Sequence, residues 1–216
     1  MRADLLFYRA VRALVVGFSR LFWRLSLDGL EHVPREGPFV LAPVHRSNID
    51  TIVVAGVTTR RMRFMGKDSL WKFAWIGKVL SALGGFPVHR GSADREALRR
   101  CIEVIEGGEP LVVFPEGTRQ SGPVVQPLFE GAAYIATRTG VPIVPVGIGG
   151  SEAAMPKGSK LLRPVKVHVV VGEPLYPVPP GPSGRAPRSA VHDLTERLAE
   201  RVQELFDRAQ SRVLGG

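Results

Sequence analysis

Short apolar segments that alternate with amphipathic ones constrain the fold of this chain more than any other feature. Between the apolar segments lie stretches with helical periodicity, at residues 49–57, 70–83, 94–106 and 130–139. The apolar segments are bounded by Gly or Pro, as is typical of buried strands, and span residues 39–44, 63–65, 86–88, 111–114, 143–146 and 165–171. This alternation predicts an α/β fold with a mainly parallel twisted sheet covered by helices.

The predicted α/β domain occupies residues 28–176 and carries flanking segments at both ends. A chain of 216 residues is long enough for one well-buried core and short for two. Residues 177–188 are rich in Pro and Gly and predict a loop, because proline removes a backbone donor and fixes the backbone. Valine and leucine then recur in steps of three and four, which predicts a C-terminal helix over 189–212 that packs on the domain.

Residues 1–27 show a second kind of helical pattern. Apolar side chains form one stripe, and arginines occupy an opposite arc of roughly 120°. The stripe comprises Phe7, Val11, Leu14, Phe18, Leu21 and Leu25, and the arginines are Arg2, Arg9, Arg12, Arg20 and Arg24. This pattern predicts an amphipathic helix at the surface of an anionic membrane. The alternative is a helix that covers the domain core and turns its arginines toward water.

A second segment favours the membrane interpretation. Between Ser69 and Leu83, Trp71 and Trp75 stand beside Lys72 and Lys78, a combination typical of the lipid headgroup level. The uncharged run in residues 13–19 is too short to span a bilayer, and no signal-peptide cleavage site follows it. We therefore expect a peripheral, monotopic membrane protein.

A formal net charge of +9 indicates anionic partners, which include nucleic acid, an acidic membrane and phosphorylated substrates. No zinc-finger spacing and no aromatic RNA-binding signature is found, so nucleic acid is not expected. Cys101 is the single cysteine, and no dense set of His, Cys and carboxylates predicts a metal site. The sequence thus predicts no metal.

The segment from His45 to Asp50 follows an apolar strand and leads into a helix, where open α/β sheets place their sites. Residues five apart on a straight helix point away from each other, so these two side chains meet only if the chain bends, with Ser47 as the N-cap. Two interpretations fit. In the structural one, Asp50 holds a backbone amide in a capping box. In the functional one, Asp50 fixes the tautomer of His45, which takes a proton from a substrate hydroxyl.

Basic side chains follow three other predicted strands. Arg119 ends the segment Phe114-Pro115-Glu116-Gly117-Thr118-Arg119, and its guanidinium is suited to bidentate phosphate binding. Lys67 and Arg90 stand after two further strands. A single such cation is usually a solvated surface charge, but their shared position after strands predicts one anion site.

Taken together, these segments resemble the glycerolipid acyltransferase family, which makes phosphatidic acid from lysophosphatidic acid (1-acylglycerol-3-phosphate). The resemblance runs from about residue 28 to 171 and keeps the family's order of motifs. The matching positions are His45, Ser47 and Asp50, then Gly85, Phe86 and Arg90, then the block from Phe114 to Arg119, and last Val141 to Val146. Val44 and His89 depart from the family pattern, which usually has Asn and an acidic residue there.

The resemblance implies that His45 deprotonates the free hydroxyl of a lysophospholipid, which attacks an acyl thioester, either acyl-CoA or an acyl carrier protein. Asp50 would steady the imidazolium, and no cofactor would be needed. Glu116 would orient Arg119 or neighbouring amides. The implied substrate-binding residues are Lys67, Arg90, Glu116, Gly117, Thr118 and Arg119, and the implied location is the cytoplasmic face of the cell membrane.

Three alternatives remain open at this point. The acceptor could be another lysophospholipid. A thioester hydrolase is a second possibility, because Gly149-Gly150-Ser151-Glu152-Ala153 loosely matches a nucleophile elbow but lacks the final glycine. A non-catalytic membrane-binding module is the third, since the basic charge permits it.

Overall fold

The computed structural model describes residues 2–88, 95–178 and 187–215. Within them the chain forms one seven-stranded sheet in the order β1-β7-β6-β2-β5-β3-β4. The strands are β1 (Ser26–Asp28), β2 (Val40–Pro43), β3 (Arg63–Lys67), β4 (Gly85–Val88), β5 (Leu111–Val112), β6 (Ile143–Gly149) and β7 (His168–Val171). Neighbouring strands run parallel except for the antiparallel pair β6 and β7. The predicted α/β fold with a mainly parallel sheet is confirmed.

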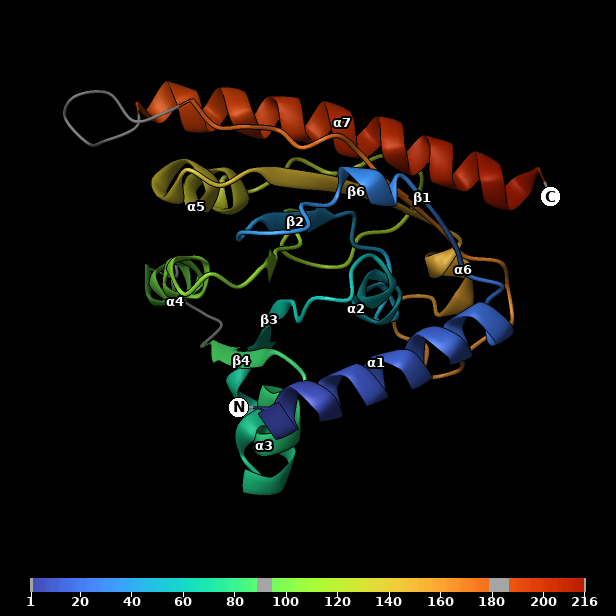
Figure 1. Cartoon of the computed structure of the whole chain (residues 1–216). Helices are drawn as coiled ribbons and strands as arrows, with labels where there is room; N and C mark the ends of the chain where they lie inside the picture. Colours follow the sequence, from blue (N-terminus) through green and yellow to red (C-terminus); the bar gives the residue numbers. More distant parts are fainter. Residues whose placement is uncertain (1, 89–94, 179–186, 216) are drawn as a thin grey trace.

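The central strands are buried along their whole length, which explains why their sequences are continuously apolar. Every residue of β2 and β6 is buried. A parallel sheet needs cover on both faces, and helices supply it here. Figure 1 shows one group on one side of the sheet and another on the opposite side. The first group is α4 (Arg95–Glu106), α5 (Gly131–Thr139) and α7 (Arg188–Leu214), and the second is α1 (Arg2–Phe22), α2 (Asp50–Val53) and α3 (Ala74–Ala82).

Short helical turns complete the chain. The predicted helix over 49–57 is α2 followed by the 3-10 turn η2 (Val54–Gly56), and that over 70–83 is η3 (Asp68–Trp71) followed by α3. The break in the second lies where Trp71 folds inward: its ring is so close to Gly66 and Gly77 that a Cβ there would lie 2.7 and 2.8 Å from it. The remaining elements are η1 (Leu30–His32) and α6 (Ser151–Ala154).

The long helix α7 lies directly on β6. A Cβ at Gly147 would lie 2.2 Å from the backbone of Leu205, and one at Gly149 would lie 2.4 Å from the carbonyl of Ala209. Glycines in β6 therefore permit this close approach of a helix to the sheet. The C-terminal helix predicted over 189–212 is present and slightly longer. Residues 179–186 of the Pro/Gly-rich segment lie outside the described residues.

The N-terminal helix ends earlier than the predicted boundary at residue 27. Arg24 has a φ of 47°, a left-handed conformation that no helix continues. The chain then enters β1, which pairs with β7, and Trp23 and Leu25 are buried in the core. Leu25 fits the helical periodicity of the sequence although it lies beyond the helix, because its side chain is buried in the core.

The predicted apolar stripe of α1 faces outward. Leu14 is 74% exposed and Leu21 is 84% exposed, and Phe7 and Phe18 are exposed as well. The helix packs on the domain through another face, which includes Tyr8 and Val16. The alternative in which the stripe covers the core is therefore wrong.

Arg12 does not lie on a water-facing basic surface of this helix as predicted. Its side chain turns inward, and Nε donates to the carbonyls of Ala55 at 2.8 Å and Thr58 at 2.7 Å. Burial lowers the pKa of Arg12 from its usual value. One of the five arginines thus anchors α1 to the segment that follows α2.

Candidate functional site

His45 and Asp50 meet at the carboxyl end of β2. The chain leaves the strand after Pro43 and turns, and Asp50 is the first residue of α2. The Nδ1 atom of His45 lies 2.9 Å from Oδ2 of Asp50. Asp50 is fully buried, while the His45 side chain is 17% exposed. The bend that the pair requires is therefore present.

The same carboxylate oxygen also holds the backbone. Oδ2 of Asp50 accepts hydrogen bonds from the amides of Arg46 and Ser47, each at 2.7 Å. The structural and functional interpretations of Asp50 are thus compatible, because one oxygen orients both the turn and the imidazole. The prediction that Ser47 is the N-cap is wrong, because the N-cap is Ile49. The Ser47 hydroxyl instead donates to the carbonyl of Met155 at 2.7 Å.

The arrangement leaves Nε2 of His45 as the nitrogen directed away from Asp50. A carboxylate only accepts, so the imidazole donates from Nδ1 and Nε2 carries the lone pair. The ring stacks on Phe114, with 4.0 Å between centroids and 25° between planes. Packing on one side and a hydrogen bond on the other fix the orientation of the ring.

His45 lines a largely apolar cavity of about 650 Å³. That volume is typical of small-molecule sites. Its walls come from β3, β4, β5, α2, α4 and α5, and include Phe64, Met65, Leu98, Cys101, Val112 and Ile135. The polar side chains in the lining are His45, Thr51 and Thr118, with Cys101 as the thiol. The cavity therefore offers an apolar ligand a place beside the histidine.

A buried ion pair holds the backbone of His45 in place. Nη1 of Arg46 lies 2.8 Å from both Oε1 and Oε2 of Glu116, and both residues are almost fully buried. Oε2 of Glu116 also accepts the backbone amide of His45 at 2.8 Å. Glu116 therefore pairs with Arg46, whereas Arg119 was the predicted partner. The alternative prediction, that Glu116 holds neighbouring amides, is correct.

Arg46 has no role in the sequence-based prediction, although it stands next to His45. Its guanidinium also donates to the carbonyls of Gly122 and Val124 and lies 4.8 Å from the ring centroid of Phe206 in α7. A fully buried arginine needs partners of this kind. Those partners are up to 160 positions away along the chain, so no local pattern identifies them.

The predicted phosphate-binding residues occupy several environments. Gly117 has a φ of 68°, and a Cβ there would lie 2.7 Å from the Phe129 ring, so glycine is needed at this turn. Thr118 is exposed and accepts a hydrogen bond from Gln120. Arg119 is partly exposed, and among the described residues it forms no ion pair.

Lys67 is exposed at the end of β3. Because β3 and β5 are parallel neighbours, Lys67 and the segment carrying Arg119 leave the sheet at the same edge. Neither residue lines the cavity beside His45. Arg90, the third predicted cation, lies outside the described residues.

Ser151, the serine of the loose nucleophile-elbow match, is fully buried at the start of α6. A nucleophile elbow needs an exposed hydroxyl. The structure thus gives no support to a serine hydrolase at that position.

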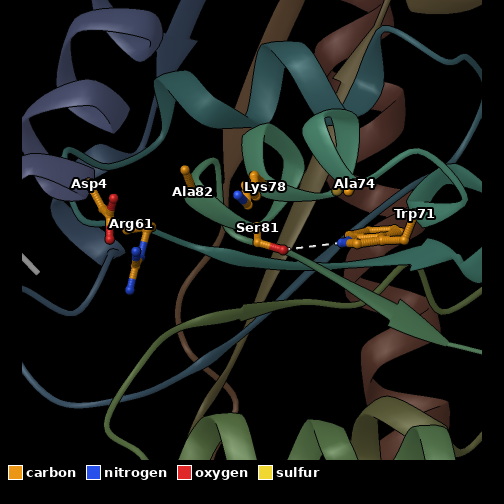
Figure 2. Close-up of a pocket in the computed structure, with 8 residues that line it drawn as sticks. Asp4, Arg61, Trp71, Ala74, Lys78, Ser81 and Ala82 are labelled. Atoms are coloured by element: carbon orange, nitrogen blue, oxygen red, sulfur yellow. Dashed lines mark hydrogen bonds between the residues drawn. The ribbon is translucent and has the colours of Figure 1, made fainter.

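The helix α3 presents a mixed surface. Phe73 and Trp75 are exposed, whereas Trp71 packs inward and donates from Nε1 to the Ser81 hydroxyl at 3.1 Å (Figure 2). A hollow of about 590 Å³ lies here, where Lys78 and Arg61 line it together with Asp4 of α1. Of the two tryptophans predicted at the headgroup level, only Trp75 is thus well exposed.

A mostly parallel α/β sheet, a His–carboxylate pair after β2 and an apolar cavity beside that pair are compatible with a protein that transfers acyl groups. The sequence agrees: the acyltransferase family model matches residues 24–149. The chain belongs to this family. The resemblance found from the motifs is confirmed.

Named proteins with similar sequences are acyltransferases as well. A 1-acyl-sn-glycerol-3-phosphate acyltransferase of Bacillus subtilis (strain 168) is 31% identical over 81% of this chain and 84% of that protein. A chloroplastic 1-acyl-sn-glycerol-3-phosphate acyltransferase of Brassica napus, BAT2, is 31% identical over 72% of this chain but only 46% of its own length. The chain thus spans less than half of this plant relative.

The fold also matches a solved structure. The crystal structure of the 1-acyl-sn-glycerophosphate (LPA) acyltransferase PlsC from Thermotoga maritima superposes with a TM-score of 0.72 at 27% identity. The match covers 92% of this chain and 80% of that one. The two proteins therefore share the same overall architecture.

Proposed function

We propose that this protein transfers a fatty acyl group from an acyl thioester to the free hydroxyl of lysophosphatidic acid, giving phosphatidic acid. The observation that carries the proposal is the His45–Asp50 pair at an apolar cavity large enough for an acyl chain. The names of the relatives from Bacillus subtilis and Thermotoga maritima support the same acceptor.

In the proposed reaction His45 is the general base. Its Nε2 takes the proton of the acceptor hydroxyl while Asp50 stabilises the imidazolium through Nδ1. The alkoxide oxygen attacks the thioester carbonyl and forms a tetrahedral intermediate. The C–S bond then breaks, the thiolate leaves, and the proton on Nε2 passes to sulfur. The products are a carboxylic ester and a free thiol, with no acyl-enzyme intermediate and no metal or other cofactor.

The two substrates approach the histidine from different sides in this proposal. The acyl chain occupies the cavity between the sheet and helices α4 and α5. The acceptor's phosphate lies outside it, at the edge where Lys67 and Arg119 leave the sheet, with Arg90 as a third cation. Gly117 lets the backbone come close and Thr118 adds a hydroxyl. Glu116 would act indirectly, by holding Arg46 and the amide of His45.

The proposed location is an anionic membrane surface on the cytoplasmic side, where thioester donors are dissolved. The exposed stripe of α1 and the exposed Phe73 and Trp75 of the η3–α3 segment support this, since apolar side chains beside basic ones favour a lipid interface. None of the described helices is long and apolar enough to cross a bilayer.

A direct assay tests the activity. Purified protein is incubated with lysophosphatidic acid and either acyl-CoA or acyl carrier protein, and free thiol and diacylated lipid are measured together. We expect one thiol per phosphatidic acid formed. Monoacylglycerol, which lacks the phosphate, serves as the matched acceptor and should react far more slowly. Thiol release without any acceptor would instead support a hydrolase, and equal rates with both acceptors would exclude a phosphate site.

A further inference from the structure

The loop that joins α6 to β7 exposes two neighbouring leucines. Leu161 is 69% exposed and Leu162 is 39% exposed. Burying such side chains on folding would have been favourable, so two adjacent ones in water suggest an apolar partner. The neighbouring contacts and charges indicate which partner this is.

The loop is closed and ordered by its own hydrogen bonds. The amide of Ser159 donates to the carbonyl of Pro156 at 2.9 Å, with Gly158 at a φ of 86°, as in a type II turn. The amide of Leu161 donates to the Ser159 hydroxyl at 3.0 Å. The amide of Arg163 donates to the carbonyl of Ala154 at 2.9 Å and closes the base. The leucines are thus presented on a preformed Ω-type loop.

The base of this loop is fixed beside the C-terminal end of α1. The carbonyl of Arg163 accepts a hydrogen bond from Nε1 of the buried Trp23 at 3.2 Å. The ring of Trp23 in turn meets Phe18 edge to face, with 5.5 Å between centroids. Phe18 belongs to the exposed apolar stripe of α1. Leu162 therefore directly precedes a residue held next to that stripe, and Figure 1 shows the loop passing beside α1.

The charges around the leucines are all of one sign. Lys157, Lys160 and Arg163 are exposed, and residues 153–166 include no acidic residue. Such a combination of apolar tips and cations complements a bilayer that carries anionic lipids, where each basic residue near the surface adds to binding. An acidic protein partner would match the charges, but it would not explain why the loop with the two leucines is held next to the exposed apolar stripe of α1.

We infer that residues 157–163 form a second membrane anchor, which inserts Leu161 and Leu162 into the interface of an anionic bilayer beside α1. The inference deepens the membrane association in the proposed function and rests on it. The loop is joined to the segment after α1 through Trp23. In this inference two contacts with the bilayer restrict the tilt of the protein relative to the membrane, whereas a single contact would only attach it. The loop begins at Met155, whose carbonyl is bound by Ser47 of the His45 segment.

Vesicle flotation tests the anchor. The double variant Leu161→Ser/Leu162→Ser is compared with wild type on phosphatidylcholine vesicles with and without phosphatidylglycerol. We expect binding to the anionic vesicles to weaken on the order of tenfold. The matched control is Tyr176→Ser/Val178→Ser, which removes two residues that are at least as exposed on average as the two leucines. They follow Leu175, which pairs with Ile143 at the start of β6, away from the loop. The control should bind like wild type.

Charge and activity readouts complete the test. Lys157→Gln/Lys160→Gln should lose affinity only for the anionic vesicles, whereas Arg197→Gln/Arg208→Gln on α7 should lose much less. Unchanged vesicle binding of the Leu161/Leu162 variant would overturn the inference. Turnover is measured in parallel on a monomeric short-chain lysophosphatidic acid, which needs no bilayer. If wild type fails to turn over that acceptor, the proposed function fails, while the flotation result still decides the anchor.

Discussion

Single residues in this protein serve backbone and chemistry together. Oδ2 of Asp50 accepts two backbone amides and the imidazole of His45. Fixing the turn therefore also fixes the tautomer of the base. This explains why a motif that looks like an ordinary helix start carries the proposed reaction.

His45→Ala should lower kcat by about 10²–10⁴-fold, because a positioned general base contributes that much. The fold should persist, since the His45 side chain lies at the cavity surface and is partly exposed. Steady-state thiol release measures the rate, and thermal unfolding monitored by circular dichroism checks the fold. Normal turnover in this variant would show that another group is the base.

His168 gives a prediction about pH. Burial lowers the pKa of His168 from 6.5, although Asp28, 3.2 Å from Nε2, opposes the shift, while Arg212 and Lys166 add to it. The Ser26 hydroxyl is hydrogen-bonded to Nδ1 at 2.6 Å. The unfolded chain then takes up a proton at a higher pH than the folded one, so this contribution to stability is present above pH 6.5 and is lost as the pH falls below it.

The variant His168→Gln should therefore show a weaker loss of stability between about pH 7 and 5 than wild type. Urea midpoints measured at several pH values give the slope. His192→Gln removes an exposed histidine on α7 and is the control. Parallel curves for wild type and His168→Gln would contradict the prediction.

At the scale of elements, α1 has three kinds of surface. One face packs on the domain through Tyr8 and Val16, and Arg12 anchors the helix to the segment after α2. The stripe with Leu14 and Leu21 is not covered by any part of the described chain. A helix that is apolar on an outward face requires an apolar medium. Removing residues 1–26 would be a poor test of this role, because it also removes the buried Trp23.

Leu14→Ser/Leu21→Ser is the sharper test. Both side chains are more than two-thirds exposed, so the fold should be little affected, and binding to anionic vesicles should weaken on the order of tenfold. The affinity should also depend on salt, as expected where arginines contribute. Flotation at low and high ionic strength measures both effects. Wild-type binding by this variant would show that the stripe does not contact lipid.

At the scale of the whole molecule, the pair Arg46–Glu116 joins distant parts of the chain. It connects the segment after β2 to the segment after β5, to residues 122–124 and to Phe206 of α7. Arg46→Met should lower the free energy of unfolding by about 3–5 kcal/mol, because Glu116 is left buried without its counterion. Arg201→Met, at an exposed pair with Glu204, should change it by less than about 1 kcal/mol.

Urea denaturation measures these changes. The double variant Arg46→Met/Glu116→Leu should recover stability, since it leaves no buried charge. It should not recover turnover, because the amide of His45 loses its acceptor. Equal stability of Arg46→Met and wild type would show that the pair contributes nothing to folding.

The cavity beside His45 is built by six elements, namely β3, β4, β5, α2, α4 and α5. Ala97→Phe should fill part of it and shift preference toward shorter acyl donors, on the order of tenfold in the ratio of kcat/KM between a long and a short chain. Arg99→Phe places the same ring at an exposed position of α4 and is the control. An unchanged ratio in Ala97→Phe would mean that the acyl chain binds elsewhere.

The sequence alone determined the α/β fold and the strand that precedes His45, and it offered the pairing of His45 with Asp50 as one of two interpretations. These follow from local periodicity and from motifs whose members lie within a few residues of each other. It also located the stripe of α1, but both a core and a membrane helix produce that pattern. Only the structure shows that the stripe faces outward.

Tertiary structure alone decided the remaining features. The partner of Glu116 is Arg46, 70 residues earlier, and the loop that carries Leu161 and Leu162 lies near the end of α1 because Trp23 holds the carbonyl of Arg163. The cavity arises where six elements meet. Such contacts depend on how separate elements pack, and packing is set by the shape of the whole core and not by the spacing of residues along the chain.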